Sequence, residues 1–333
     1  MGLFRNCVLL AGAAAVSLCA PAATGPALAQ DVPTIRIGWT IPAEDTKYLM
    51  MKRPELFPAL GSAYNIEWVQ FQGTAPMAQA MIAGAVECST QSALVLANGH
   101  LQGGLESYVV ASHVDSTPGH FSPYWAVRED DPIREVADLR GKTVSINVLG
   151  SGLMGPLTMY LEEGGLDPRR DIRLVELGFS GSEDALRSGR VDAAVMNQPF
   201  ARNAESAGGV RKLFSTEDVL TTMVQIFEVC SKAFVDEQPE VAEAYVRDLT
   251  SAMDLVLADR AQTIEVAASV TNIPVPVLEA YYMTENDFER YEGGAFQFDA
   301  LQDMFDLYTR IGMLEGELDA QLFRHPTLSA PLR

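Results

Sequence analysis

The chain has 333 residues, with 24 lysine and arginine residues against 44 aspartate and glutamate residues, which gives a formal net charge of −20 at pH 7. This acidity argues against nucleic acid or an anionic lipid surface as a partner, although a local site in an acidic protein can still bind an anion. The length exceeds what one small hydrophobic core usually supports, so the sequence indicates two lobes.

Residues 1–29 have the features of a cleavable export signal rather than of a folded segment. Arg5 precedes the apolar segment Val8–Leu18, and Ala27-Leu28-Ala29 supplies small residues for cleavage before Gln30. No later segment approaches the roughly 20 apolar residues that a membrane span requires. The sequence therefore predicts a soluble, exported protein.

The chain after this signal begins with strands that alternate with helices. Strands are expected at Thr34–Trp39, Asn65–Phe71 and Val86–Ser89, where β-branched and aromatic residues lie between turn signals. One helix is expected over Leu49–Leu60, and a second begins with Thr74 as its N-cap. The order is βαβαβ.

The same βαβαβ order recurs over Ile133–Arg202 and predicts parallel strands with crossover helices. The expected elements are strands at Lys142–Val148, Ile172–Leu177 and Val191–Met196, a helix from Leu153 on, and a helix capped by Ser182. Ligands of such sheets bind beyond the carboxyl ends of the strands.

Two further strands, Tyr108–Ala111 and Tyr124–Arg128, are expected to flank a long solvent-facing loop at Ser112–Pro123. A return strand is expected at Val224–Cys230. The pattern from residue 235 on is mainly helical and includes a helix at Phe298–Met313.

Signals for metal binding and catalysis are weak. The sequence contains no HExxH, CxxC or Walker motif, and Gly178–Ser182 lacks the glycine spacing of a nucleophile elbow. His113, Asp115 and His120 match no established ligand spacing for zinc, and a solvent-facing loop explains them equally well. We therefore expect no catalytic residue, no metal and no cofactor.

Cys88 and Cys230 are the cysteines that remain after the export signal is removed. The residues by themselves favour two separate buried thiols, because sequence alone does not set the distance between them. A disulfide stays open as the alternative, since the exported compartment permits one.

The turn Gly150-Ser151-Gly152 lies at a strand end with a helix N-terminus behind it. Backbone N–H groups in such a turn can bind an anion or a carbonyl oxygen. By itself the motif is more often a tight turn that needs glycine. Its position opposite Gln72-Gly73-Thr74 and Gln91-Ser92 favours a binding site.

Four further residues are candidates for a ligand-binding role. Trp39 could stack on a ligand or belong to the core. Asn197 and Gln198 place neutral amides at a strand end, and Phe200 adds an apolar wall, although a loop that caps a helix would use the same residues. Because few cations lie near these loops, a small, highly charged oxyanion is disfavoured.

Several of these segments resemble the nitrate/taurine/alkanesulfonate group of type II periplasmic solute-binding proteins. The resemblance rests on Asp138–Val144, the glycine-serine turn, Gly165–Pro168, Gly189–Val195 and the pair Pro199-Phe200. It implies an α/β fold with two lobes joined by two crossover strands, with a helical C-terminal region on lobe one. Lobe one would comprise residues 30–118 and 230–333, and lobe two residues 119–229.

The resemblance also implies a ligand between the lobes, an ABC-importer permease as partner, a monomer, and a periplasmic location. It places the strand with Cys230 beside the strand with Cys88, which is the reason to keep a disulfide open. The chain has Asn197-Gln198 where many relatives have tryptophan and glutamate, which argues against assigning taurine, nitrate or a simple sulfonate from the resemblance. The ligand-binding residues expected from the motifs and the resemblance together are Trp39, Thr40, Gln72, Gly73, Thr74, Gln91, Ser92, His113, Gly150, Ser151, Gly152, Asn197, Gln198 and Phe200.

The leading hypothesis is a solute-binding protein that closes on an organic acid, a sulfonate or an amide-bearing heterocycle. An exported enzyme on the same scaffold, acting on a pyrimidine-like molecule, is an alternative, although the chain lacks the cysteine-rich segment of such relatives. A sensory binding protein is the other alternative.

Overall fold

The computed structural model describes residues 32–41 and 43–328, so the predicted export signal lies outside the described residues. A five-stranded sheet has the order β2-β1-β3-β10-β4. Strands β1, β2 and β3 are parallel, whereas β10 runs antiparallel to both β3 and β4. These strands are β1 (Thr34–Trp39), β2 (Asn65–Gln70), β3 (Cys88–Gln91), β4 (Ser107–Ser116) and β10 (Met223–Ser231).

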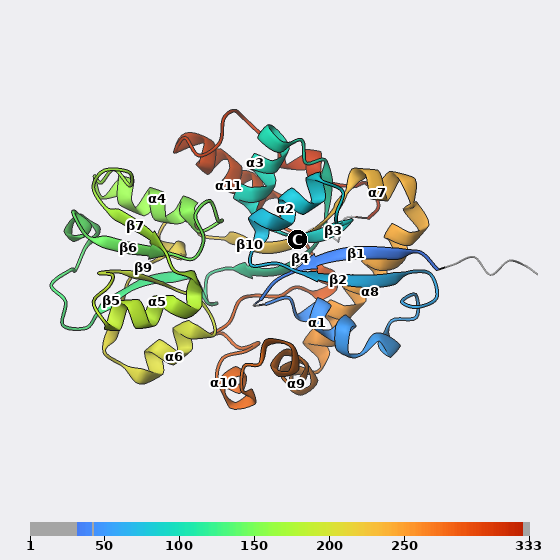
Figure 1. Ribbon diagram of the computed structural model, residues 1–333, viewed down its shortest axis with the longest axis horizontal. Coiled ribbons are helices and arrows are strands. Elements are labelled where there is room, and N and C mark those ends of the chain that lie inside the picture. The colour runs from blue at the N-terminus through green and yellow to red at the C-terminus, as the bar shows by residue number, and fades with distance from the viewer. Residues whose placement is uncertain (1–31, 42, 329–333) are drawn as a thin grey trace, which may run out of the picture. The chain divides into compact units, whose positions relative to one another are not determined.

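Helices cover both faces of this first sheet (Figure 1). One face carries α2 (Thr74–Ile82), α3 (Ala93–Gly103) and α11 (Phe298–Arg310), and the other carries α1 (Asp45–Lys52), α8 (Pro239–Ala258) and α9 (Arg260–Thr271). The buried side chains form two large apolar clusters, one of which contains the residues of α1, α8 and α9. The other contains residues of α3 and α11 and continues into the second sheet.

The second sheet is built from two pieces. Strand β5 (Tyr124–Arg128) lies between β8 (Ala194–Met196) and β9 (Val210–Ser215), and β6 (Thr143–Ile146) is parallel to β7 (Arg173–Glu176). A parallel bridge from Val144 to Ala193 joins the two pieces. The predicted parallel order of the second unit is therefore confirmed. Its helices are α4 (Met154–Glu163), α5 (Gly178–Arg187) and α6 (Phe200–Ala207).

Shorter elements complete the described chain. They are α7 (Lys232–Glu237), α10 (Val275–Glu279) and the 3-10 turns η1 (Pro54–Leu56), η2 (Val136–Leu139), η3 (Thr216–Asp218), η4 (Glu292–Gly294) and η5 (Ala320–Phe323). Within the described residues, every helix is too short or too polar to cross a membrane.

The predicted solvent-facing loop at Ser112–Pro123 is wrong in its first half, because β4 continues to Ser116. His113 and Asp115 are 1% and 0% exposed. Their polar groups have partners distant in sequence, since Glu228 lies 3.1 Å from His113 and Gln297 donates to Asp115. Buried polar groups persist when they are hydrogen-bonded, so a polar stretch can form an interior strand here.

Two helix boundaries also differ from the prediction. The helix expected over Leu49–Leu60 ends at Lys52 and is followed by η1, because Pro54 cannot continue the hydrogen-bond ladder. Helix α5 begins at Gly178, so Ser182 lies inside the helix instead of capping it. The Ser182 hydroxyl donates to the carbonyl of Gly178 one turn earlier.

Cys88 and Cys230 form a disulfide, so the preference for two separate thiols is wrong. The two residues are register partners in the antiparallel pair β3–β10. Cross-strand neighbours of this kind have Cβ atoms close enough for bonding. The bond connects positions that are 142 residues apart in the sequence.

A close contact joins helix α4 of the second sheet to helix α11 of the first. A Cβ atom at Gly155 would lie 2.1 Å from Cε1 of Tyr308, so only glycine permits this approach. The Tyr308 hydroxyl lies 3.5 Å from the carbonyl of Gly152, at the turn before α4. This contact places that turn beside the first sheet.

Candidate functional site

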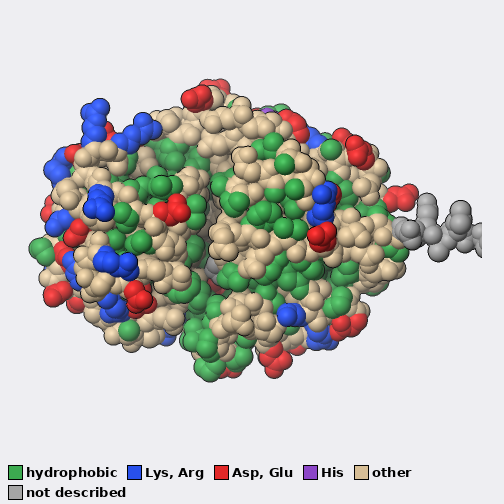
Figure 2. Space-filling model, in the orientation of Figure 1, with side chains coloured by type: hydrophobic (Ala, Val, Ile, Leu, Met, Phe, Trp, Pro, Cys, Tyr) green, Lys and Arg blue, Asp and Glu red, His purple; other side chains and the backbone are tan. Residues whose placement is uncertain are grey.

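A cavity of about 320 Å³ lies where the two sheets face each other. Figure 2 shows a groove between the two parts, bordered mainly by apolar and uncharged side chains. The first turns of α2, α5 and α6 border the cavity, as do Ser92 before α3 and Ser151–Leu153 before α4. Helix N-termini carry unpaired N–H groups and a partial positive charge, so they favour oxygen acceptors and anions.

The side chains that line the cavity are all uncharged. They are Thr40, Ile41, Ala43, Gln72, Gly73, Thr74, Ala75, Ser92, Val114, Asn147, Val148, Ser151, Gly152, Leu153, Gly178, Phe179, Ser180, Asn197, Phe200, Met223, Gln225, Ile226 and Phe288. A guest is therefore held by dipoles and apolar contacts rather than by an ion pair.

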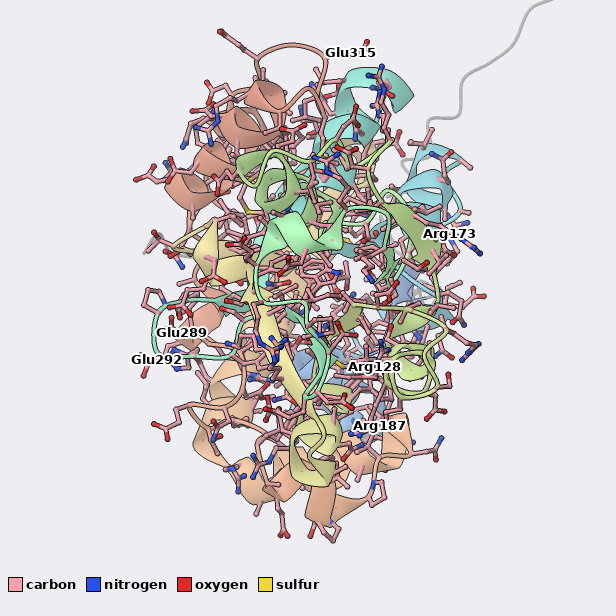
Figure 3. The ribbon with its side chains drawn as sticks, turned by 90° about the vertical axis from the view of Figure 1, so that its left-hand side faces the viewer. Arg128, Arg173, Arg187, Glu289, Glu292 and Glu315 are labelled. Atoms are coloured by element: carbon pink, nitrogen blue, oxygen red, sulfur yellow. A yellow bond between two sulfur atoms is a disulfide. The ribbon has the colours of Figure 1, made fainter. Side chains whose placement is uncertain are left out.

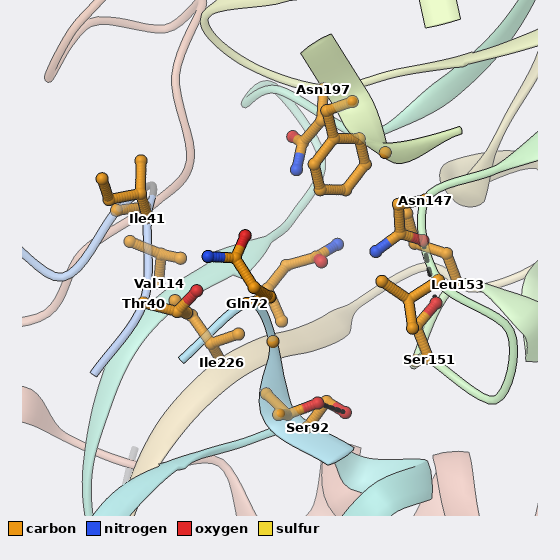
Figure 4. A pocket seen from close by; sticks show the side chains of 18 of the residues that line it. Thr40, Ile41, Gln72, Ser92, Val114, Asn147, Ser151, Leu153, Asn197 and Ile226 are labelled. Carbon is orange, nitrogen blue, oxygen red and sulfur yellow. Dashed lines mark hydrogen bonds between the residues drawn. The ribbon is translucent and has the colours of Figure 1, made fainter. Parts of the chain in front are cut away.

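One side of the cavity presents amide donors. Ser151 donates to Oδ1 of Asn147 at 2.8 Å, and Oδ1 of Asn197 accepts from the backbone N–H of Gln198 at 2.9 Å. Neither Nδ2 group donates to any described protein atom, and both side chains point into the cavity (Figure 4). Asn197 is only 9% exposed. Both donors are available to a guest that carries oxygen or nitrogen acceptors.

The opposite side carries an apolar patch beside Thr40 and Gln72 (Figure 4). Val114 and Ile226 come from the adjacent strands β4 and β10, and Ile41 follows β1. Ala43, Val114 and Phe288 form a small buried cluster of their own, with Ile226 packed against it. This wall can contact a hydrocarbon or ring portion of a guest.

Nine of the fourteen predicted site residues line this cavity. They are Thr40, Gln72, Gly73, Thr74, Ser92, Ser151, Gly152, Asn197 and Phe200. Thr74 and Ser92 lie within hydrogen-bond distance, at 3.2 Å, which connects two of the predicted loops. Their role in binding stays a prediction.

Trp39, Gln91 and Gly150 lie outside the lining. The Trp39 ring packs edge-on against Tyr48 at 6.1 Å between centroids, in the core behind the cavity. Gln91 is fully buried and donates to Ser89. Gly150 supplies the left-handed backbone, with φ of 78°, that the turn requires.

His113 and Gln198 also lie outside the lining. The His113 ring lies between Thr46 and Glu228, with nitrogen–oxygen distances of 3.2 and 3.1 Å. Gln198 is 3% exposed and donates to the backbone carbonyl of Asn286 at 2.9 Å. Both side chains therefore have protein partners that the local sequence does not reveal.

Sequence reasoning did not identify several lining residues. Asn147 follows β6, so the rule that ligands bind at strand carboxyl ends could have identified it. Gln225 lies in the return strand with its amide donating to Ser116. Phe288 has no local signal, because it reaches the cavity from a segment after α10.

A charged network lies behind the cavity, in the interior of the first part. The Lys47 ammonium is fully buried and lies 3.2 Å from Glu44 and 2.7 Å from Glu228. Burial raises the pKa of Glu44 above its usual value. Burial would also raise the pKa of Glu228, but the charge of Lys47 and the hydrogen bond with His113 outweigh it and lower that pKa.

This network reaches the cavity wall through backbone contacts. Glu44 accepts from the N–H of Thr40 at 3.0 Å, and Lys47 donates to the carbonyl of Gly38 at 2.7 Å. The charges therefore fix the loop that carries Thr40 and Ile41. Among the described residues, no group of three or more metal-ligating side chains could hold a metal ion.

Known proteins resemble the chain in sequence and in fold. The chain is 25% identical over 217 residues to an Escherichia coli (strain K12) protein named as an aliphatic sulfonates-binding protein, a match covering 65% of this chain and 66% of that one. It is 28% identical over 213 residues to a Brachyspira hyodysenteriae protein named as an ABC transporter periplasmic binding protein, covering 59% and 58%. The matches thus span less than two thirds of these relatives' lengths.

The fold matches the alkanesulfonate-binding protein SsuA from Xanthomonas axonopodis pv. citri bound to MOPS. The TM-score is 0.69 and the identity 21%, over 88% of this chain and 98% of the other. This likeness shows that the α/β fold is that of periplasmic binding proteins. The profile of the NMT1-like family matches residues 28–272, most of the chain, so the protein belongs to the NMT1-like family.

Proposed function

We propose that the protein is the solute-binding component of an ABC importer, and that its cavity captures a small organic molecule with an acceptor-rich head and an apolar body. The names of both sequence relatives support binding rather than catalysis. The proposed partners are this ligand and the importer's permease.

The observation that carries the proposal is the division of the cavity into two uncharged sides. The free amide donors of Asn147 and Asn197 face the side that carries Val114 and Ile226 (Figure 4). Phe288 packs with Val114 in the same apolar cluster. A head with sulfonate, carboxylate or carbonyl oxygens would accept from the amides and from helix N-termini. A small dianion would lack both a cationic partner and a use for the apolar wall.

Capture would proceed by closure of the two sheet-containing parts around the guest. Residues 117–123 and 216–222 connect strands of the first sheet to strands of the second, as two crossovers in a hinged protein would. Closure excludes water and strengthens each hydrogen bond inside the cavity. The predicted lobes are residues 30–118 with 230–333, and residues 119–229; because β10 (Met223–Ser231) pairs within the first sheet, the second boundary belongs near residue 222 instead.

Delivery to a permease requires a location outside the cytoplasmic membrane. The predicted export signal and the name of the Brachyspira hyodysenteriae relative support the periplasm. The proposed oligomeric state is a monomer.

The test is a thermal-shift and calorimetry panel that varies head and body separately. Butane-1-sulfonate, pentanoate and pentanamide share a butyl body with three heads, and sulfate has no body. We expect at least one of the three butyl compounds to raise Tm at hundreds of micromolar, because ligand binding stabilises the folded state. Sulfate should leave Tm unchanged at equal ionic strength.

Two outcomes would contradict the proposal. Stabilisation by sulfate equal to that by butane-1-sulfonate would show that the apolar wall contributes nothing. An absence of stabilisation by these compounds, and by longer and ring-bearing homologues of each head, would show that the cavity does not select such molecules.

A further inference from the structure

Residues 284–290, which we name the strap, lie between α10 and α11 and extend toward α6 (Figure 1). Figure 3, which looks onto the second sheet, shows Glu289 of the strap at one edge of the view, on the opposite side from Arg173 of β7. The strap contributes Phe288 to the apolar wall. Its other residues contact both sheet-containing parts and one crossover between them.

The strap is firmly attached to the first part. Glu289 and Asp115 exchange both backbone hydrogen bonds, at 3.0 and 2.9 Å, so the strap extends the pairing of β4. The buried Arg290 donates to Asp45 at 2.6 Å and to Asp287 at 2.8 Å. Removing one partner of such a buried charge cluster is costly, so this attachment is permanent in the folded protein.

The strap also contacts the crossover that leads to the second sheet. The N–H of Phe121 donates to the carbonyl of Asp287 at 2.9 Å. The rings of Phe121 and Phe288 pack edge to face, with centroids 5.2 Å apart. The strap therefore lies beside the segment that must bend if the two parts move.

One side chain that connects the strap to the second part is that of Gln198. Gln198, in the turn between β8 and α6, donates from Nε2 to the carbonyl of Asn286 at 2.9 Å. The same side chain accepts from the N–H of Arg202 in α6 at 3.3 Å. On either side of Gln198, Asn197 and Phe200 line the cavity. A bond at Gln198 thus holds the cavity wall of the second part.

We propose that the Gln198–Asn286 hydrogen bond is a latch that holds the strap and the β8–α6 turn together when the cavity is closed. The contact between Gly155 of α4 and Tyr308 of α11 joins the two parts at one place. The Gln198–Asn286 hydrogen bond joins them at the strap. This role rests on the proposed function, because closure matters only if the cavity traps a guest. Gln198 is a positioning residue and does not touch the guest.

The latch can be broken without removing any cavity-lining residue. Gln198→Met keeps the side-chain length and loses both hydrogen bonds, whereas Gln198→Glu keeps the acceptor for Arg202 and loses only the donor to Asn286. One neutral hydrogen bond shifts an equilibrium about three- to tenfold. Both variants should increase the ratio of open to closed protein by that factor.

The measurement is double electron–electron resonance between spin labels at Glu55→Cys and Arg170→Cys. Their side chains are 61% and 84% exposed and lie on the first and second parts. Cys88 and Cys230 are buried in a disulfide, so the new cysteines are the reactive ones. Unliganded protein is used, so the result is independent of any failure to find a ligand. Gln102→Met, which removes an exposed amide bonded to Asn98, is the matched control.

A longer-distance population in both Gln198 variants, absent from the control, would support the latch. A change in Gln198→Met alone would assign the effect to the lost Arg202 contact and overturn the proposal. Distance distributions identical to that of the parent protein would overturn it as well. Should Gln198→Met fail to fold, Gln198→Glu, which preserves the α6 contact, decides the question.

Discussion

The polar interior behind β3 and β10 differs from the polar side of the cavity in the way its groups are paired. In the interior, Lys47 contacts two carboxylates, and Glu228 also accepts from Tyr245 at 2.8 Å. In the cavity, Asn147 and Asn197 use their oxygens within the protein and leave their donors free. The Lys47 charge of the interior is paired without a guest, whereas the amide donors of the cavity are not.

This difference separates stability from binding. Removing one partner of a buried ion pair lowers the stability of the fold by several kcal/mol. Neutral amides at a solvent-filled cavity can be changed at little cost to folding, because water replaces the lost bond. Mutations in the two regions should therefore affect different measurements.

The largest effect is expected for Lys47→Met, which leaves Glu44 and Glu228 buried without their cation. We expect the free energy of unfolding to fall by about 3–5 kcal/mol, measured by urea denaturation. The control is Lys142→Met, since Lys142 is 39% exposed and 3.9 Å from Asp192, and an exposed pair contributes below about 1 kcal/mol. Equal losses in the two variants would mean that the interior network is not desolvated.

The next effect concerns the disulfide in the same interior, two residues from Glu228 along β10. Replacing Cys88 and Cys230 by serine removes a cross-link over 142 residues. A loss of about 2–4 kcal/mol is expected, because the unfolded chain gains freedom. Reductant should lower the Tm of the parent protein and leave the double variant unchanged. A Tm insensitive to reductant in both would contradict a stabilising bond.

The sequence predicts most of the fold because strand and helix periods are local. The two βαβαβ units, the return strand and the mainly helical region after residue 235 follow from such patterns. The interior part of β4 could not be predicted, because the partners of His113 and Asp115 lie 115 and 182 residues away. The disulfide depends likewise on the register of a return strand, which no local pattern fixes.

The candidate site is predictable to the extent that it lies at strand ends. Thr40, Ser92 and Asn197 follow strands and line the cavity. Gln198 also follows a strand, but its neighbour after folding is Asn286. Whether a side chain at such an end faces a guest or another segment depends on segments distant in sequence.

A third prediction concerns Asp115, between the interior network and the cavity. Burial raises its pKa to about 7, although Gln297 and Ser112 donate to it. The folded carboxyl keeps its proton up to about pH 7, whereas the unfolded one releases it near pH 4. The folded state thus binds more protons in this window, and the contribution of Asp115 to stability falls as pH rises from 4 to 7.

Asp115→Asn should therefore match the parent protein near pH 4 and exceed it at pH 8 by roughly 1–4 kcal/mol. Urea denaturation at five pH values checks this. Asp306→Asn, at an exposed carboxylate that accepts from Gln302, is the control. A difference from the parent protein that does not vary with pH would show that Asp115 is ionised throughout.

Asn197→Asp is expected to change stability least among these variants. It is expected to weaken ligand binding strongly. The change keeps the shape and the acceptor for the Gln198 N–H, so stability should change by less than about 1 kcal/mol. It replaces the free donor with a carboxylate that repels an acceptor-rich head. The Kd for butane-1-sulfonate should rise at least about tenfold, since a hydrogen bond to a charged group contributes about 1.5–3 kcal/mol.

The control is Asn98→Asp, on α3 and outside the cavity, which should change neither the stability nor the Kd much. If Asn197→Asp instead lowered stability as Lys47→Met does, the Asn197 amide would be needed for folding. The distinction between paired interior charges and unpaired cavity amides would then fail.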